Sequence, residues 1–70
     1  MTFSDFRLSA KEFFIKHGIV LRYGQALMIR LNGTSPYLYK NIPDYANPFY
    51  DDSRADEFFN YLSLNWSKAF

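Results

Sequence analysis

The sequence predicts an all-α fold: a small single-domain bundle, residues 1–70, of three main helices plus one short helix. Apolar residues recur at the three- and four-residue spacing of a helix face in three separate stretches. Residues that start or end helices stand at the boundaries of these stretches. A chain of seventy residues without cysteine is a marginal domain, so its support must come from its eight Phe, six Tyr and one Trp.

The first helix is expected to run from Thr2 to His17. Thr2 suits its start because Asp5 stands three residues later in a capping-box position, and Ser9 offers an alternative start of the same kind. Gly18 is expected to end the helix, with Ile19 making the apolar contact that often follows. The face expected in the core consists of Phe3, Phe6, Ala10, Phe13, Phe14 and His17.

A second helix is expected from Val20 to Leu31, ending at Asn32-Gly33 because both residues tolerate a positive φ. A β-strand from Ile19 to Tyr23 is the alternative, since these residues favour strands. Gly24 stands where a helix prefers alanine, at a cost of about 1 kcal/mol. It therefore predicts that another segment approaches the helix closely there. The buried face is expected to comprise Val20, Tyr23, Gly24, Leu27, Met28 and Leu31.

A third, short helix is expected from Pro36 to Asn41, because Ser35 is a good cap and proline suits the first helical position. Pro43 and Pro48 then interrupt regular structure. The loop around them carries three aromatic residues that are expected to lie over the core: Tyr45, Phe49 and Tyr50.

The last helix is expected to open at Asp51 to Ser53, with Ser53 and Asp56 forming another capping box. Its buried stripe is expected to comprise Ala55, Phe58, Phe59, Leu62 and Trp66. Tyr61 and Leu64 lie off that stripe, so we expect them at the surface.

Residue types needed for catalysis or metal binding are scarce. His17 is the single histidine, and a place in the last turn of a helix accounts for it, so neither a catalytic base nor a zinc site is expected. Four acids near the start of the last helix lack the spacing of a calcium loop: Asp51, Asp52, Asp56 and Glu57. The three glycines are too far apart for a phosphate-binding loop. We therefore expect no enzyme, no metal and no cofactor.

Charge is distributed unevenly along the chain. Residues 1–40 carry six Lys/Arg and two acids, 6 − 2 = +4, whereas residues 41–70 carry two and five, 2 − 5 = −3. Either the two halves attract each other within the fold, or the surface is bipolar and docks on partners or on copies of itself. A nucleic-acid-binding face is one alternative, formed by Arg7, Lys11, Lys16, Arg22 and Arg30. The net charge of only +1 disfavours it.

Large apolar residues outside the expected stripes indicate a protein-binding surface. Ile29, Tyr61, Leu64 and Phe70 are in this position. Aromatic and arginine side chains are the usual anchors of interfaces. The expected partner-binding residues are Arg22, Gln25, Ile29, Arg30, Tyr61 and Leu64.

Three blocks of the chain resemble a group of short, uncharacterised bacteriophage proteins. The blocks are RYGQALM at residues 22–28, NPFYDD at residues 47–52, and an aromatic helix ending in Asn65-Trp66. The group commonly shows RYGQALxNAL, then DPFYxD, then a helix ending near a tryptophan. Ile29-Arg30 and Asn47 depart from that pattern. The resemblance implies a phage origin and a role in the infected host, and it supplies no catalytic residues.

The expected function is therefore binding of a bacterial host protein as an inhibitor of host defence, of the anti-CRISPR type or another counter-defence. The alternatives are a nucleic-acid-binding regulator and a self-associating structural component. The first residues lack the basic and apolar regions of a signal peptide, and no apolar run approaches the ~18 residues that span a bilayer. We expect a protein of the host cytoplasm without a membrane partner.

Overall fold

The computed structural model describes residues 1–69 and is all-α, as predicted. Its helices are α1 (Phe3–His17), α2 (Tyr23–Thr34), α3 (Pro36–Asn41) and α4 (Ala55–Asn65), joined by the short 3₁₀ turns η1 (Asp44–Ala46), η2 (Asp52–Arg54) and η3 (Trp66–Lys68). No strand occurs among the described residues, so the strand considered for Ile19 to Tyr23 is wrong.

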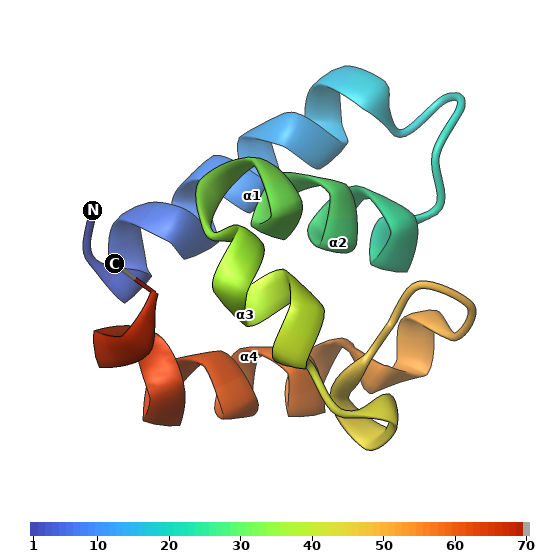
Figure 1. Cartoon of the computed structure of the whole chain (residues 1–70). Coiled ribbons are helices and arrows are strands. Elements are labelled where there is room, and N and C mark those ends of the chain that lie inside the picture. Colours follow the sequence, from blue (N-terminus) through green and yellow to red (C-terminus); the bar gives the residue numbers. More distant parts are fainter. Residues whose placement is uncertain (70) are drawn as a thin grey trace.

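The four helices form two layers that α3 connects. α1 and α2 run side by side, α4 runs across the opposite side of the molecule, and α3 passes between them (Figure 1). The core between the layers is formed by Phe6 and Ala10 of α1, Leu27, Met28 and Leu31 of α2, Leu38 of α3, and Phe58, Phe59 and Leu62 of α4. Trp66 closes one end, with its ring 5.2 Å from that of Phe6. Aromatic packing therefore replaces the missing disulfides as the support of the fold.

α1 begins with the predicted cap and ends at His17 as predicted, but Gly18 does not adopt the expected terminating conformation. Thr2 and Asp5 form the expected reciprocal capping box, with bonds of 3.1 and 3.2 Å. His17 was expected in the core but is exposed, with its ring stacked 4.5 Å from that of Phe13. Gly18 keeps right-handed helical φ and ψ, so the apolar contact expected of Ile19 does not form. Ile19 is instead fully exposed.

α2 begins and ends three residues later than predicted. Val20 lies in a tight turn closed by its N–H and that of Leu21, which both donate to the His17 carbonyl. The helix starts where the Gln25 side chain accepts from the Arg22 N–H at 3.0 Å. Gly33 does not end it: its φ is not positive, and it lies inside the helix. Ser35 ends α2 by adopting an extended conformation.

The third helix is confirmed at its predicted bounds, whereas the start of α4 differs. Ser35 is buried; its hydroxyl accepts from the Leu38 N–H and donates to the Ala69 carbonyl at 2.9 Å, so it joins α3 to the chain after α4. The capping box expected of Ser53 is wrong, because Ser53 lies inside η2 and α4 starts two residues later. The buried stripe of α4 is confirmed for Phe58, Phe59 and Leu62, whereas Ala55 and Trp66 are half-buried.

The loop aromatics do not all cover the core. Phe49 is half-buried, but Tyr45 is 60% exposed and Tyr50 is 85% exposed. The buried side chains in this segment are the small ones, Ala46 and Pro48. Phe49 packs against the core, whereas Tyr45 and Tyr50 stay at the surface.

Candidate functional site

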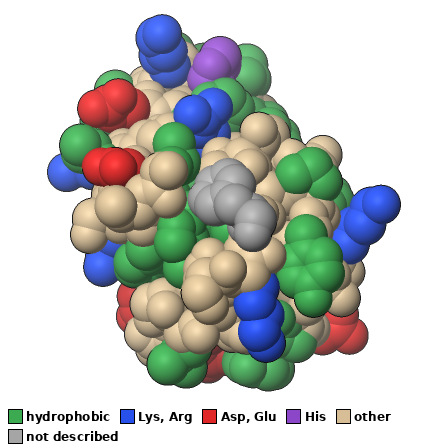
Figure 2. Space-filling model, turned by 60° about the vertical axis from the view of Figure 1, so that its left-hand side comes forward, with side chains coloured by type: hydrophobic (Ala, Val, Ile, Leu, Met, Phe, Trp, Pro, Cys, Tyr) green, Lys and Arg blue, Asp and Glu red, His purple; other side chains and the backbone are tan. Residues whose placement is uncertain are grey.

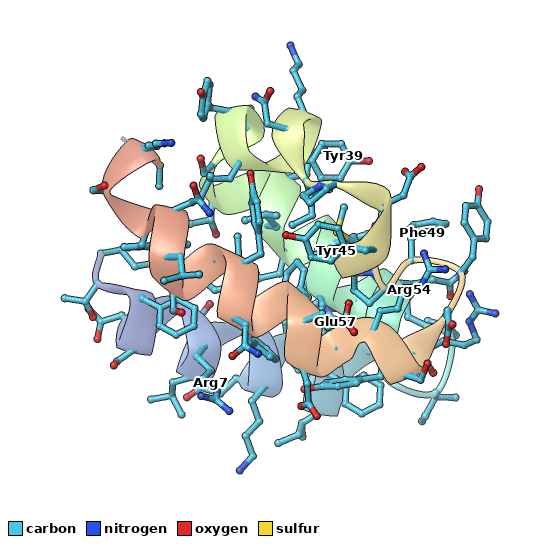
Figure 3. All side chains as sticks on the ribbon, turned by 90° about the horizontal axis from the view of Figure 1, so that it is seen from below. Arg7, Tyr39, Tyr45, Phe49, Arg54 and Glu57 are labelled. Atoms are coloured by element: carbon cyan, nitrogen blue, oxygen red, sulfur yellow. The ribbon has the colours of Figure 1, made fainter. Side chains whose placement is uncertain are left out.

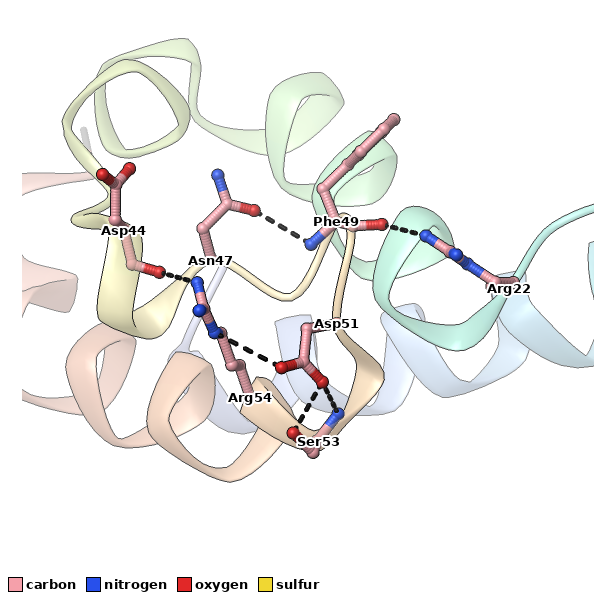
Figure 4. A network of polar contacts seen from close by, with 7 residues as sticks. All are labelled: Arg22, Asp44, Asn47, Phe49, Asp51, Ser53 and Arg54. Carbon is pink, nitrogen blue, oxygen red and sulfur yellow. Dashed lines mark hydrogen bonds and ion pairs between the residues drawn. The ribbon is translucent and has the colours of Figure 1, made fainter.

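The close approach predicted at Gly24 is present. An added Cβ at Gly24 would lie 1.7 Å from the Pro48 carbonyl oxygen, so only glycine fits. The Gly24 N–H also donates to the Asp52 carboxylate at 2.9 Å, and the Arg22 guanidinium donates to the Phe49 carbonyl at 2.6 Å. We call this junction of the α2 start with residues 47–52 the clasp (Figure 4).

The loop side of the clasp is braced by its own hydrogen bonds. Asn47 Oδ1 accepts from the Phe49 N–H at 2.9 Å, and the Arg54 guanidinium donates to the Asp44 carbonyl at 2.6 Å (Figure 4). The Ser53 hydroxyl and N–H both donate to Asp51, and together with the nearby Arg54 cation they lower the pKa of the Asp51 carboxyl below its ordinary value. These bonds fix the turn that carries Pro48 to Gly24.

Two of the three blocks that carry the resemblance to phage proteins therefore meet in space. The first two form the clasp. In the third, Trp66 donates from Nε1 to the Met1 carbonyl at 3.0 Å and packs on Phe3 at 5.8 Å between ring centroids. Residues at these positions are accounted for by folding, so a binding surface must be sought elsewhere.

A hollow lies between α1 and α4. Its volume is about 580 Å³, and Arg7, Lys11, Phe14 and Ile15 of α1 face Ala55, Asp56 and Phe59 of α4 across it, with Tyr23 of α2 also in the lining. A second hollow of about 350 Å³ shares Arg7, Asp56 and Phe59 and continues past Phe3, Asn60 and Ser63. We call the two together the α1–α4 groove. Its floor is aromatic and its length follows the helices.

Cations stand along the α1 side of this groove. The Arg7 guanidinium lies over the Phe59 ring, 5.0 Å from its centroid, in a cation–π contact. Among residues 1–69, neither Arg7 nor Lys11 has a carboxylate within ion-pair distance, although Asp56 lines the same groove. Two positive side chains therefore border aromatic surface without charge partners in the described chain.

An exposed apolar corner adjoins the α1–α4 groove. Ile15 belongs to both, and Ile19 and Val20 follow it in the turn between α1 and α2. Their exposed fractions are 72%, 100% and 78%. This exposed apolar corner is therefore a candidate extension of the groove.

A smaller hollow lies on the other side of α4. Tyr45, Tyr61 and Leu64 line it together with Glu57, and its volume is about 290 Å³. Figure 3 shows α4 lying between Arg7 on one side and Tyr45 on the other. We call this feature the outer hollow. Leu64 is exposed as predicted, but Tyr61 is half-buried and donates to the Asn41 carbonyl at 3.3 Å.

The six predicted partner-binding residues do not form one surface. Tyr61 and Leu64 meet in the outer hollow. Arg22 and Gln25 serve the clasp and the start of α2. Arg30 donates to the Ser9 hydroxyl at 2.7 Å, which ties α2 to α1, and the neighbouring Ile29 is exposed. Phe70, also expected outside the buried stripes, lies outside the described residues.

The five basic residues predicted for nucleic acid are also divided. Arg7 and Lys11 line the α1–α4 groove, whereas Lys16 and Arg30 line a separate hollow. Arg22 belongs to the clasp. On the face shown in Figure 2, Lys and Arg side chains are scattered among polar and apolar atoms. They form no continuous track for a phosphate backbone on that face.

The composition of the groove was not recognised from the sequence, although a signal was present. Arg7, Lys11, Phe14 and Ile15 repeat at three- and four-residue spacing, one step around the helix from the core face. Phe59 is buried in the core as predicted and also lines the groove, whereas Phe14, expected in the core, is half-buried and lines the groove too. α1 therefore carries two stripes, and only the tertiary arrangement shows that the second remains open.

Metal-binding and membrane-spanning features were searched within the described residues. No group of three or more His, Asp or Glu side chains is arranged there to hold a metal ion. No helix of residues 1–69 is both long enough and apolar enough to cross a bilayer.

In comparisons with known proteins, no family model, curated protein or solved structure matches this chain. The resemblance to phage proteins therefore stays a prediction, and the function must be argued from the surface itself.

Proposed function

We propose that this protein acts by binding a bacterial host protein, and that in a phage-infected cell this binding inhibits a host defence. The α1–α4 groove is the observation that supports binding. It combines an aromatic floor, two cations without charge partners in the described chain, and an adjoining apolar corner at Ile15. Such a combination is typical of interface hot spots. The host and the defence role come from the resemblance of the three sequence blocks.

Two other surfaces of the molecule support binding less well. The outer hollow is smaller and is bordered by the Glu57 carboxylate. Nucleic-acid binding is the weaker alternative, because its five candidate residues lie in three places and Asp56 stands in the groove beside two of them.

Capture from bacterial lysate with single-residue variants tests the proposal. Ile15→Arg places a cation at the groove mouth, and Leu64→Arg does the same in the outer hollow. Leu8→Arg is the matched control, because Leu8 is an exposed residue of α1, 59% exposed, outside the hollows described above. We expect the wild type, Leu64→Arg and Leu8→Arg to retain one bacterial protein that Ile15→Arg loses.

The same variants are then compared in cells. Expression of the wild type should raise phage plaque numbers on a host with active defences, and Ile15→Arg should not. If Ile15→Arg still captures the bacterial protein, the groove is not the binding surface. A captured protein whose binding leaves host defence unchanged argues against the inhibitory role.

A further inference from the structure

The two walls of the α1–α4 groove differ in charge, and this difference indicates what kind of segment fits the groove. Arg7 and Lys11 stand one helical turn apart on α1, so they point along the same edge of the groove. On the opposite wall, Asp56 stands near the start of α4, and the positions further along are the neutral Asn60 and Ser63. A bound segment therefore meets positive charge on its α1 side and mostly neutral groups on its α4 side.

The shape of the groove favours a linear segment over a compact ligand. The two hollows share Arg7, Asp56 and Phe59, and they follow the direction of α1 and α4 from Ile15 to Phe3. These helices run in opposite chain directions (Figure 1), and residues of both line the groove. A helix laid along it would pack on both, as in helix-in-groove recognition.

Arg7 is already held in position for such a ligand. Its guanidinium lies over the Phe59 ring, and no described carboxylate competes for its N–H groups at ion-pair distance. A guanidinium fixed by stacking loses less conformational freedom on binding a carboxylate and is able to bind both oxygens.

We propose that the α1–α4 groove receives an acidic amphipathic helix of the partner protein, with its apolar seam on Phe14, Ile15 and Phe59 and its Asp or Glu side chains against Arg7 and Lys11. This inference rests on the proposed function and adds the chemistry of the partner. The complementary charge is the argument for an acidic occupant, and the aromatic floor is the argument for an apolar seam.

Three synthetic helices of about 18 residues, roughly five turns, test this. The first carries Leu and Phe at three- and four-residue spacing with Glu on one flank. The second replaces each Glu by Lys, and the third scrambles the first. With the full chain, fluorescence anisotropy should show binding of the Glu helix at least about tenfold tighter than of the Lys helix, with little binding of the scrambled one.

Charge reversal in the groove sharpens the test. The double variant Arg7→Glu/Lys11→Glu should no longer bind the synthetic Glu helix and should bind the synthetic Lys helix instead. Lys40→Glu/Lys68→Glu is the matched control: it changes the net charge equally, and both residues are exposed and lie outside the α1–α4 groove. It should keep the wild-type preference. Circular dichroism confirms that each variant is folded.

Several outcomes overturn the inference. Equal affinity of the protein for the Glu and Lys helices rules out an acidic partner helix. A preference that Arg7→Glu/Lys11→Glu leaves unchanged rules it out as well. Tighter binding of a single-stranded oligonucleotide at about 50 mM salt, lost in the same variant, assigns the groove to nucleic acid instead. A dimer in light scattering that Ile15→Arg dissociates assigns it to a second copy.

The proposed function and this inference fail separately. If Ile15→Arg abolishes capture of the bacterial protein but Arg7→Glu/Lys11→Glu does not, the host-binding function stands and the acidic helix is wrong. If the Glu helix binds as expected but no bacterial protein is captured through the groove, the host-binding function is wrong.

Discussion

The clasp and the α1–α4 groove use similar residue types for opposite purposes. In the clasp, Arg22 donates to a backbone carbonyl, and the Asp52 carboxylate accepts from the Gly24 N–H. In the groove, Arg7 and Lys11 lie beside aromatic rings, and no described carboxylate pairs with them. Polar groups that are satisfied internally hold a fold together, whereas charged groups beside apolar surface remain available for a partner.

The largest expected effect comes from closing the space at Gly24. Gly24→Ala places a methyl group against the Pro48 carbonyl, so the clasp must open, at a cost of about 3 kcal/mol by analogy with overpacked cores. That is a large share of the stability of a small domain and should lower the melting temperature by more than about 10 °C. Thermal unfolding followed by circular dichroism measures it.

Gly33→Ala is the matched control for this prediction. Gly33 also lies in α2, but nothing stands within 4 Å of an added Cβ and its φ is not positive. Alanine should therefore stabilise the protein by up to about 1 kcal/mol. Equal effects at the two glycines would show that the clasp contributes nothing.

The next largest loss of stability is expected at Ser35. Its buried hydroxyl joins α3 to the chain after α4 through two hydrogen bonds. Ser35→Ala removes the hydroxyl that donates to the Ala69 carbonyl and accepts from the Leu38 N–H in a buried site. We expect a loss of about 1–3 kcal/mol, because a buried donor and acceptor are left unpaired. Urea unfolding measures the loss, with Ser67→Ala at an exposed position as the control.

Asp52 tests the polar part of the clasp. Asp52→Ala removes the acceptor of the Gly24 N–H, and we expect a loss of about 1 kcal/mol for one partly exposed hydrogen bond. Asp52→Asn keeps an oxygen at that position and should lose less. An Asn variant as unstable as the Ala variant would assign the effect to the charge and not to the hydrogen bond.

The cations of the groove should matter little to folding. Lys11→Ala is expected to change the free energy of unfolding by less than about 0.5 kcal/mol, since it has no ion-pair partner among residues 1–69. Arg7→Ala should cost about 0.5 kcal/mol through loss of its contact with Phe59. Both variants should weaken binding of the Glu helix, and a larger loss of stability than of affinity would contradict the assignment of these residues to binding.

The smallest expected effect is the pH dependence at Asp51. Bonds from Ser53 and attraction to Arg54 lower its pKa in the folded state below the ordinary value of 3.8. A lowered folded pKa stabilises the protein above 3.8, and this contribution is lost as the pH falls through the folded pKa. Asp51→Asn should therefore be less stable than the wild type at pH 7, and the difference should shrink as the pH falls below 3.8 and disappear below the lowered folded pKa. Urea unfolding at pH 7 and at these acidic pH values measures it.

The local signals in the chain were sufficient for the helices and some of their ends. Thr2 with Asp5, and Ser35 before Pro36, placed two helix starts correctly, because a cap is a contact between residues three apart. Gly24 correctly indicated a close approach, although the partner segment could not be identified. The start of α4 was missed because Asp52 bonds to Gly24, 28 residues earlier, and Asp51 caps a 3₁₀ turn instead.

The sequence by itself determined an all-α chain with a crowded glycine and an excess of aromatic side chains, because spacing and capping act between near neighbours. Only the tertiary structure decided which apolar stripes are covered. Phe6 is buried against Phe58 of α4, whereas Ile15, on the same helix, stays exposed at one end of the α1–α4 groove. The difference is set by contacts between residues about fifty positions apart, which no local pattern encodes.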